Sequence, residues 1–161
     1  MKKELFKHEI VILKNTFLRL LRRGADINLI KLIKKTHPAD LAIVFRYFDE
    51  DQQSQVFQLM QNKKHTLEFL TELDDLFIAK LLKIEKIDRI AKLIQNASTN
   101  EQSYILAALD DNQAQSVIDQ LKVEKKEEIE EIMAYPEDSA GALMATDVFT
   151  LYKNTTCRQA L

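Results

Sequence analysis

Glycine and proline are scarce in this chain, and their scarcity is the strongest constraint on its fold. Only two residues of each type occur among 161. Tight hairpin turns and sharp bends depend on these residue types, so the chain has few places to form them. Leucine, isoleucine, lysine, glutamate, glutamine and alanine are abundant instead, and all of them suit helices. The composition therefore predicts an all-α protein with helices almost throughout.

Hydrophobic spacing supports this prediction at the N-terminal end. Between Lys3 and Arg22, apolar residues recur every three or four positions and line one face of a helix, namely Phe6, Ile10, Leu13, Phe17 and Leu20. Gly24 is expected to end this helix. A short helix capped by Asp26 should follow. The next helix should open at His37-Pro38-Ala39-Asp40, which combines a proline with an acid near the helix start.

A short sequence motif, called the acidic phrase below, recurs at three expected helix junctions. It consists of an apolar residue followed by acidic residues: Phe48-Asp49-Glu50, Leu73-Asp74-Asp75 and Leu109-Asp110-Asp111. In each phrase the first aspartate is predicted to accept hydrogen bonds from the free N–H groups of the following helix. The phrases stand 25 and 36 residues apart, which is an irregular repetition. They favour short antiparallel helix pairs stacked as a superhelical solenoid, with a compact, non-repetitive bundle as the alternative.

The sequence changes character after residue 134. Pro136 and Gly141 interrupt the helical periodicity there. Further on, residues 148–152 are rich in β-branched and aromatic side chains and predict a short strand. We therefore expect a helical domain at 1–134, a linker at 135–146 and a short extended stub at 147–161. Because such a stub cannot form a domain alone, we expect the chain to be a piece of a longer protein.

No set of residues predicts catalysis, and an enzyme is not expected. His8, His37 and His65 are widely separated, Cys157 is the single cysteine, and no glycine-rich loop could hold a phosphate. His37 is best interpreted as a capping or packing residue. One cysteine favours a reducing compartment. Apolar runs such as residues 41–45 are far shorter than the roughly 20 residues of a membrane-spanning helix.

Charge is distributed unevenly along the chain. The formal net charge is only −2, which gives no argument for a nucleic-acid partner. Residues 1–37 nevertheless hold ten Lys/Arg against three Asp/Glu, whereas residues 101–138 hold three against eleven. The sequence thus predicts a basic end and an acidic end.

The remaining candidate ligands in the sequence are groups of neighbouring acidic residues: Asp49 to Asp51, Asp74 with Asp75, Asp110 with Asp111, and Glu137 with Asp138. Hard divalent cations take oxygen ligands, and Mg²⁺ accepts only one or two carboxylates from any one surface. Each pair can also be explained as a helix cap beside a solvated neighbour. The pairs alone do not decide between these interpretations.

Two motifs resemble a known family. Tyr135-Pro136-Glu137-Asp138-Ser139-Ala140-Gly141-Ala142-Leu143-Met144 is similar to the junction between two cytosolic domains of MgtE-type magnesium transporters, and His37-Pro38-Ala39-Asp40-Leu41 resembles that family's His-Pro-x-Asp-Leu opening. Residues 148–161 look like the first strand and helix start of a CBS domain. The resemblance implies a superhelical N domain, which in the full protein precedes two CBS domains, a connecting helix and a dimeric membrane pore.

The resemblance also implies a function. In that family, intracellular Mg²⁺ bridges acidic residues of the N and CBS domains and keeps the pore shut. The chain would then be a cytosolic regulatory domain at the inner face of the plasma membrane, working with its own CBS domains and pore in a homodimeric transporter. The resemblance places metal ligands at Glu68, Glu101 and the backbone carbonyl of Ala142. Mg²⁺ should bind weakly to this chain alone, because half of the ligands would be missing.

One departure from the family pattern leaves alternatives open. The family's second acidic cluster falls at residues 96–101, where Glu101 is the single carboxylate. This member could sense Mg²⁺ more weakly, through other ligands, or chiefly through its CBS domains. Two alternative hypotheses for the function need no metal. The chain could be a helical-repeat module that binds a protein partner, or its basic N-terminal end could rest on an anionic membrane surface.

Overall fold

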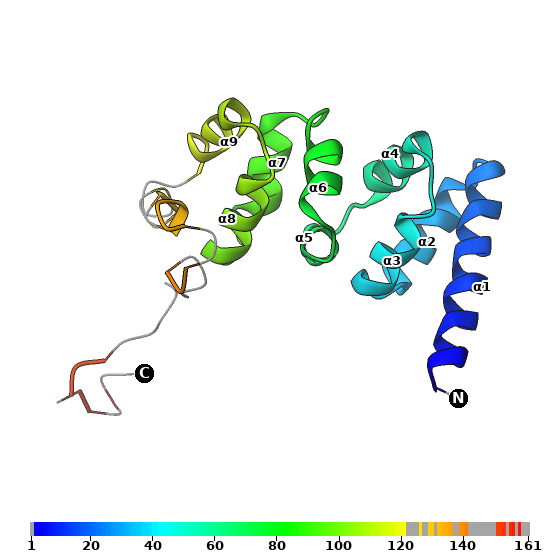
Figure 1. Ribbon diagram of the computed structural model, residues 1–161, viewed down its shortest axis with the longest axis horizontal. Coiled ribbons are helices and arrows are strands. Elements are labelled where there is room, and N and C mark those ends of the chain that lie inside the picture. The colour runs from blue at the N-terminus through cyan, green and yellow to red at the C-terminus, as the bar shows by residue number, and fades with distance from the viewer. Residues whose placement is uncertain are drawn as a thin grey trace.

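The computed structural model describes residues 2–121, 126, 129–130, 132–136, 139–141, 151–153, 155–156 and 158, with side chains from His8 onward. In these residues the regular secondary structure is helical (Figure 1). In chain order the helices are α1 (Lys2–Arg22), α2 (Asp26–Lys35), α3 (Pro38–Phe45), α4 (Glu50–Leu59), α5 (Lys63–Thr71), α6 (Asp75–Leu82), α7 (Ile87–Ile94), α8 (Thr99–Ala107) and α9 (Asp111–Ile118). The all-α prediction is confirmed.

The helices stack in two rows. The odd-numbered helices form one row, in which each of α1, α3, α5, α7 and α9 packs against the next. The even-numbered helices form the other row, from α2 through α4 and α6 to α8. Figure 1 shows the rows running from α1 at one end of the molecule to α9 at the other. This arrangement is the predicted superhelical stack of short antiparallel helices.

The repeat is more regular than the acidic phrases indicated. Helices of the even row start at residues 26, 50, 75 and 99, and α3, α5, α7 and α9 start at residues 38, 63, 87 and 111. One helix pair therefore recurs every 24 or 25 residues, and two pairs recur every 49 in the even row. The phrases looked irregular because they mark only the helices that are capped by aspartate. Asn62 and Ser98 cap other helices and escape that pattern.

Side-chain caps begin most of the helices. Asp49, Asp74 and Asp110 each accept a hydrogen bond from the third residue of the following helix, as predicted. Asp26 does not cap α2, because the N-cap position is Ala25; the Asp26 carboxylate instead accepts from the Gln55 amide at 3.0 Å. Gly24 ends α1 with a φ of 59°, a left-handed conformation that glycine adopts without strain.

The core runs continuously between the two rows. Every described helix contributes apolar side chains to it, from Phe17 in α1 to Val117 in α9. At the N-terminal end, the Phe48 ring lies 5.7 Å from that of Phe17, and the Phe45 ring lies 5.0 Å from that of Phe69. Because each helix contacts mainly its neighbours in the rows, burial depends on stacking rather than on one central helix.

Two buried glutamines, which the sequence analysis did not single out, join successive helices. The Gln53 amide donates to the carbonyls of Phe45 and Phe48 at 3.3 and 3.1 Å. The Gln102 amide donates to the Ile94 carbonyl at 2.8 Å, 49 residues further along. Both glutamines are the fourth residue of their helix, a position that Leu29 and Ile78 occupy in α2 and α6. The four-helix unit therefore repeats in side-chain chemistry as well as in length.

The predictions for the C-terminal region concern residues that lie mostly outside the described part of the chain. This applies to most of the linker at 135–146, to most of the stub at 147–161 and to residues 148–150 of the expected strand. Leu151 and Tyr152 are described and belong to neither a helix nor a strand. Within the described part of the chain, no helix combines the length and apolar character needed to cross a membrane.

Candidate functional site

A cavity of about 620 Å³ lies where α6, α8 and α9 meet residues 132–135. We call it the acidic groove. Its lining comprises Asp75, Asn100, Ser103, Tyr104, Leu106, Ala107, Leu109, Asp111, Ala114, Ile132, Met133 and Tyr135. Aliphatic side chains form much of its wall, and polar groups reach it from the N-terminal turns of three helices. Solenoid stacking brings these turns together from distant parts of the sequence.

Two of the predicted acidic pairs converge on this groove. Asp74 and Asp110 are occupied as N-caps of α6 and α9, which leaves Asp75 and Asp111 as the first helical residues beside the cavity. Asp74 also pairs with Arg46 at 3.5 Å, whereas no ion pair among the described residues neutralises Asp75 or Asp111. Capping therefore explains one member of each pair, and the other has no ion-pair partner in the described part of the chain.

Helix α8 adds buried oxygen atoms without partners. Asn100 Oδ1 and Ser103 Oγ are both inaccessible to solvent and make no hydrogen bond. The Ser103 residue is only 8% exposed. A buried polar atom that lacks a partner is destabilising. Both residues line the acidic groove, but these two oxygen atoms are themselves covered.

Tyr104 links α8 to the start of α6. Its hydroxyl donates to the Leu73 carbonyl at 2.8 Å. Burial raises the pKa of the Tyr104 hydroxyl above its usual value of 10.0, and the nearby negative charges of Asp75 and Asp74 raise it further. The phenol therefore stays protonated at neutral pH, and its pKa depends on the negative charge beside it.

The chemistry of the acidic groove is that of oxygen acceptors. The carboxylates of Asp75 and Asp111, which line it, suit a hard cation or a group with several N–H donors. Asn100, Ser103 and Tyr104 were not identified from the sequence. Their i, i+3 and i+4 spacing places them on one face of α8, but neutral polar residues on a helix give no distinct signal in a sequence.

Glu68, the first predicted ligand, lies on α5. Its side chain is 46% exposed and forms a loose ion pair with Lys64, one turn earlier, at 3.9 Å. This exposed carboxylate remains available to an external cation, because a surface pair at this distance is weak.

Glu101, the second predicted ligand, lies in the first turn of α8, a helix that packs against α5. Its Oε2 accepts hydrogen bonds from the Ser98 backbone N–H at 2.9 Å and the Ser98 hydroxyl at 2.8 Å, which completes a capping box. Ala142, the third, lies outside the described residues. Among the described side chains no group of three or more His, Cys, Asp or Glu could hold a metal ion.

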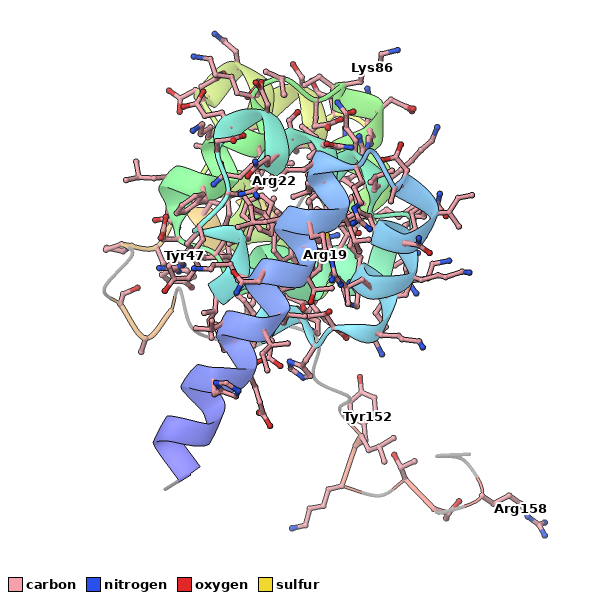
Figure 2. All side chains as sticks on the ribbon, turned by 90° about the vertical axis from the view of Figure 1, so that its right-hand side faces the viewer. Arg19, Arg22, Tyr47, Lys86, Tyr152 and Arg158 are labelled. Carbon is pink, nitrogen blue, oxygen red and sulfur yellow. The ribbon has the colours of Figure 1, made fainter. Side chains whose placement is uncertain are left out.

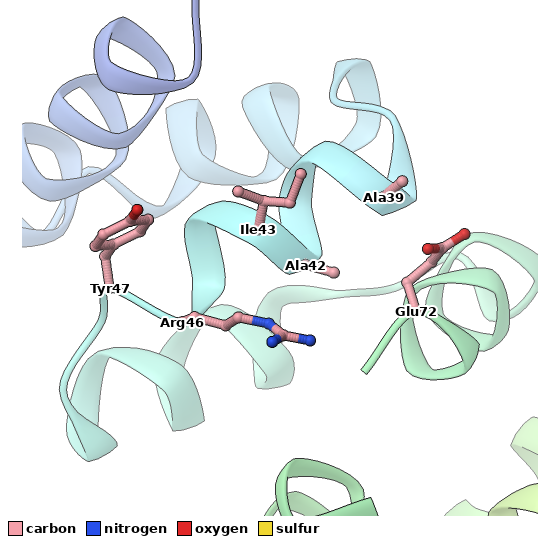
Figure 3. A pocket seen from close by; sticks show the side chains of 6 residues that line it. All are labelled: Ala39, Ala42, Ile43, Arg46, Tyr47 and Glu72. Carbon is pink, nitrogen blue, oxygen red and sulfur yellow. The ribbon is translucent and has the colours of Figure 1, made fainter. Parts of the chain in front are cut away.

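A second, smaller cavity of about 360 Å³ opens between α3 and α5 (Figure 3). Ala39, Ala42, Ile43, Arg46, Tyr47 and Glu72 line it. The Ile43 and Tyr47 side chains are exposed, and the Lys14 ammonium of α1 lies 4.9 Å from the centre of the Tyr47 ring. This cavity offers an apolar floor with one charge of each sign at its edge.

Two of the three histidines, His37 and His65, have structural contacts. His37 Nδ1 accepts the backbone N–H of Ala39 at 3.3 Å and so caps α3, as predicted. His65 Nε2 lies 2.9 Å from the Thr36 carbonyl and joins α5 to the end of α2. Both imidazoles thus contact backbone at helix ends.

Comparisons with known proteins give two positive findings. The family described as the MgtE intracellular N domain matches residues 36–138. A solved structure described as the soluble part of a magnesium transporter shares the fold, with a TM-score of 0.70 at 19% sequence identity. That likeness covers 94% of this chain but 59% of the solved chain, so this chain spans well under the whole of that structure. No curated protein matches the chain.

Proposed function

Because the chain belongs to the family of MgtE intracellular N domains, we propose that it is the cytosolic regulatory domain of a magnesium transporter. It senses Mg²⁺ at the inner face of the plasma membrane and gates the pore by docking against CBS domains that follow it. It has no catalytic role. The observation that carries the proposal is the family match over residues 36–138, which takes in most of the solenoid.

The charges of the solenoid supply a mechanism. Asp75 and Asp111 line the acidic groove and form no ion pair with a described residue, and Glu68 forms a loose surface pair with Lys64. If the docked domain presents carboxylates of its own, facing acids repel one another until a divalent cation neutralises them. Mg²⁺ favours oxygen ligands and takes one or two carboxylates from each surface. The docked arrangement is therefore stabilised only when the ion is plentiful, since the ion binds that state better.

Glu68, Glu101 and the Ala142 carbonyl remain the proposed ligands within this chain. Glu101 would have to combine ligation with its capping box, which already engages one of its oxygens. Substitution by glutamine separates these roles, because a glutamine side chain preserves the capping box but removes the negative charge. We also propose that the parent transporter is a homodimer, which would contain two copies of each site.

Solution scattering on the soluble part of the parent protein, including its CBS domains, tests the proposal. Mg²⁺ in the millimolar range is expected to reduce the radius of gyration. Glu68→Gln with Glu101→Gln should raise the Mg²⁺ concentration at the midpoint by about tenfold, which corresponds to about 1.4 kcal/mol. Glu9→Gln is the matched control, because it removes one exposed carboxylate at the opposite, basic end. If the double variant becomes compact at the same Mg²⁺ concentration as the wild type, these residues are excluded as ligands.

An adaptor function is the alternative, and the cavity beside Ile43 and Tyr47 favours it. An exposed isoleucine and tyrosine next to a small apolar cavity could hold one anchoring side chain of a protein partner. Under this alternative the soluble part of the parent protein would show no compaction with Mg²⁺. Partner binding would then be lost in Ile43→Ser and retained in Glu68→Gln.

A further inference from the structure

The proposed function leaves α1 and α2 unexplained. The family match begins at residue 36, after both helices. They form the end of the solenoid opposite α9, and Figure 2 looks directly at this end, with α1 in front. The N-terminal turns of α1 extend beyond the helices against which it packs. This end therefore presents two helices to solvent on the side away from α3 and α4.

The outward faces of both helices combine cations with exposed aliphatic side chains. On α1, opposite the buried Phe17, they carry Val11, Ile12, Arg19 and Arg22, and Arg23 follows directly after the helix. On α2, opposite the buried Leu29, they carry Ile27, Lys31, Lys34 and Lys35. Val11, Ile12 and Ile27 are 47%, 53% and 73% exposed. We call these nine side chains the basic face.

Among the described residues, the cations of this end form no ion pair. Residues 8–37 hold seven Lys/Arg against Glu9 and Asp26. Each ion pair found among the described residues lies between Arg46 and Lys126, so none of them involves these seven cations. Asp26 is bound by the neutral Gln55 amide rather than by a cation. The positive charge of the basic face is therefore free to act on an external partner.

We propose that the basic face docks on an anionic phospholipid surface. Long basic side chains attract anionic headgroups, and neighbouring aliphatic side chains can enter the boundary between headgroups and acyl chains. The acidic groove and the cavity beside Ile43 and Tyr47 contain none of the nine side chains of the basic face. Only Lys34 lines a cavity, a small one of about 160 Å³ beside Ile33 and His65. Spread charges without a groove match mobile lipid headgroups better than the fixed carboxylates of a protein. This inference does not depend on magnesium sensing.

Co-sedimentation of the 161-residue chain with lipid vesicles tests the inference. Vesicles of phosphatidylcholine with about 30% phosphatidylglycerol should bind the chain, and pure phosphatidylcholine vesicles should bind it far less. Raising the salt concentration should weaken binding, because salt screens the attraction. Equal binding to both vesicles, or no binding to the anionic ones, would overturn the proposal.

Charge variants locate the surface. Lys31→Gln, Lys34→Gln and Lys35→Gln together should weaken binding to anionic vesicles by about tenfold to hundredfold, because each cation contributes separately. The matched control replaces three exposed lysines elsewhere, Lys63, Lys83 and Lys86, by glutamine. Lys86 lies away from α1 at the upper edge of Figure 2. Equal losses in the two triple variants would show that net charge alone acts and would overturn the assignment to this face.

A third variant tests the aliphatic contribution. Ile12→Gln with Ile27→Gln preserves all charges and helix propensity, so its binding should fall several-fold at every salt concentration. Circular dichroism should show unchanged helix content in all variants. A different result would be a salt-sensitive oligomer that sediments without vesicles and does not bind lipid. The partner of the basic face would then be the acidic end of a second copy, and the lipid proposal would be wrong.

Discussion

Gln102 shows how a single buried side chain can join two helices. Its amide donates to the Ile94 carbonyl, yet that carbonyl also accepts the Ala97 N–H at 2.9 Å, and Gln102 Oε1 has no partner. Gln102→Ala should lower the free energy of unfolding by about 2 kcal/mol, because it leaves a cavity and removes a hydrogen bond. Gln102→Leu should lose less than about 1 kcal/mol, because leucine fills the space and no carbonyl is left unpaired.

Urea denaturation followed by circular dichroism measures both variants. Equal losses for alanine and leucine would show that the amide hydrogen bond outweighs packing at this position. The equivalent substitutions at Gln53 provide an internal comparison, since that amide makes two hydrogen bonds and lies 49 residues earlier in the repeat.

Tyr104 gives the protein an alkaline dependence of stability. Its pKa is raised in the folded state, chiefly by burial and then by the charge of Asp75. The stabilising contribution is therefore complete below pH 10, the value for an unfolded tyrosine, and is lost as pH rises through the folded pKa. The free energy of unfolding should fall more steeply above about pH 10 in the wild type than in Tyr104→Phe. Parallel declines in urea titrations would contradict this assignment.

At the scale of elements, Gly24 separates α1 from α2. Its φ of 59° lies in the left-handed region, and an added Cβ would meet no atom within 4 Å. The expected loss in Gly24→Ala, about 1 kcal/mol, therefore comes from backbone strain alone. Gly24→Asn should lose less, since asparagine tolerates this conformation. Thermal unfolding of both variants measures the difference, and an unstrained alanine would leave the melting temperature unchanged.

The elements were more predictable than the site they build. Asp49, Asp74 and Asp110 marked three helix starts correctly, because capping depends on neighbouring residues in the chain. Asp26 was wrongly predicted to be the N-cap of α2, which is Ala25, because an N-cap aspartate and a first-turn aspartate look alike in a sequence. Asn100 and Ser103 could not be identified, because their burial depends on helices that stack around α8 from elsewhere in the chain. Ligation by Glu68, Glu101 and Ala142 stays a prediction.

At the scale of the whole molecule, the charge asymmetry of the sequence becomes an asymmetry between the two ends of the solenoid. The basic residues gather on α1 and α2, and the acidic groove forms around α8 and α9. The sequence predicted this asymmetry because a solenoid preserves chain order in space. A compact bundle would have mixed the two regions. The proposed lipid contact uses α1 and α2, whereas the proposed metal ligands lie on α5 and beyond it, so the two proposals can be tested separately.

The two-row stack also makes stability local. Phe17 is fully buried in α1, which packs against α2 and α3, whereas Ile105 is fully buried in α8, which packs against α5 and α6. Phe17→Ala should lower local stability by about 3 to 5 kcal/mol. In a solenoid this loss stays with the nearest neighbours, so amide hydrogen exchange should accelerate in α1 and α2 while α7 to α9 keep their protection. Ile105→Ala should produce the reverse pattern, and uniform acceleration in both variants would mean that the chain unfolds as one cooperative unit.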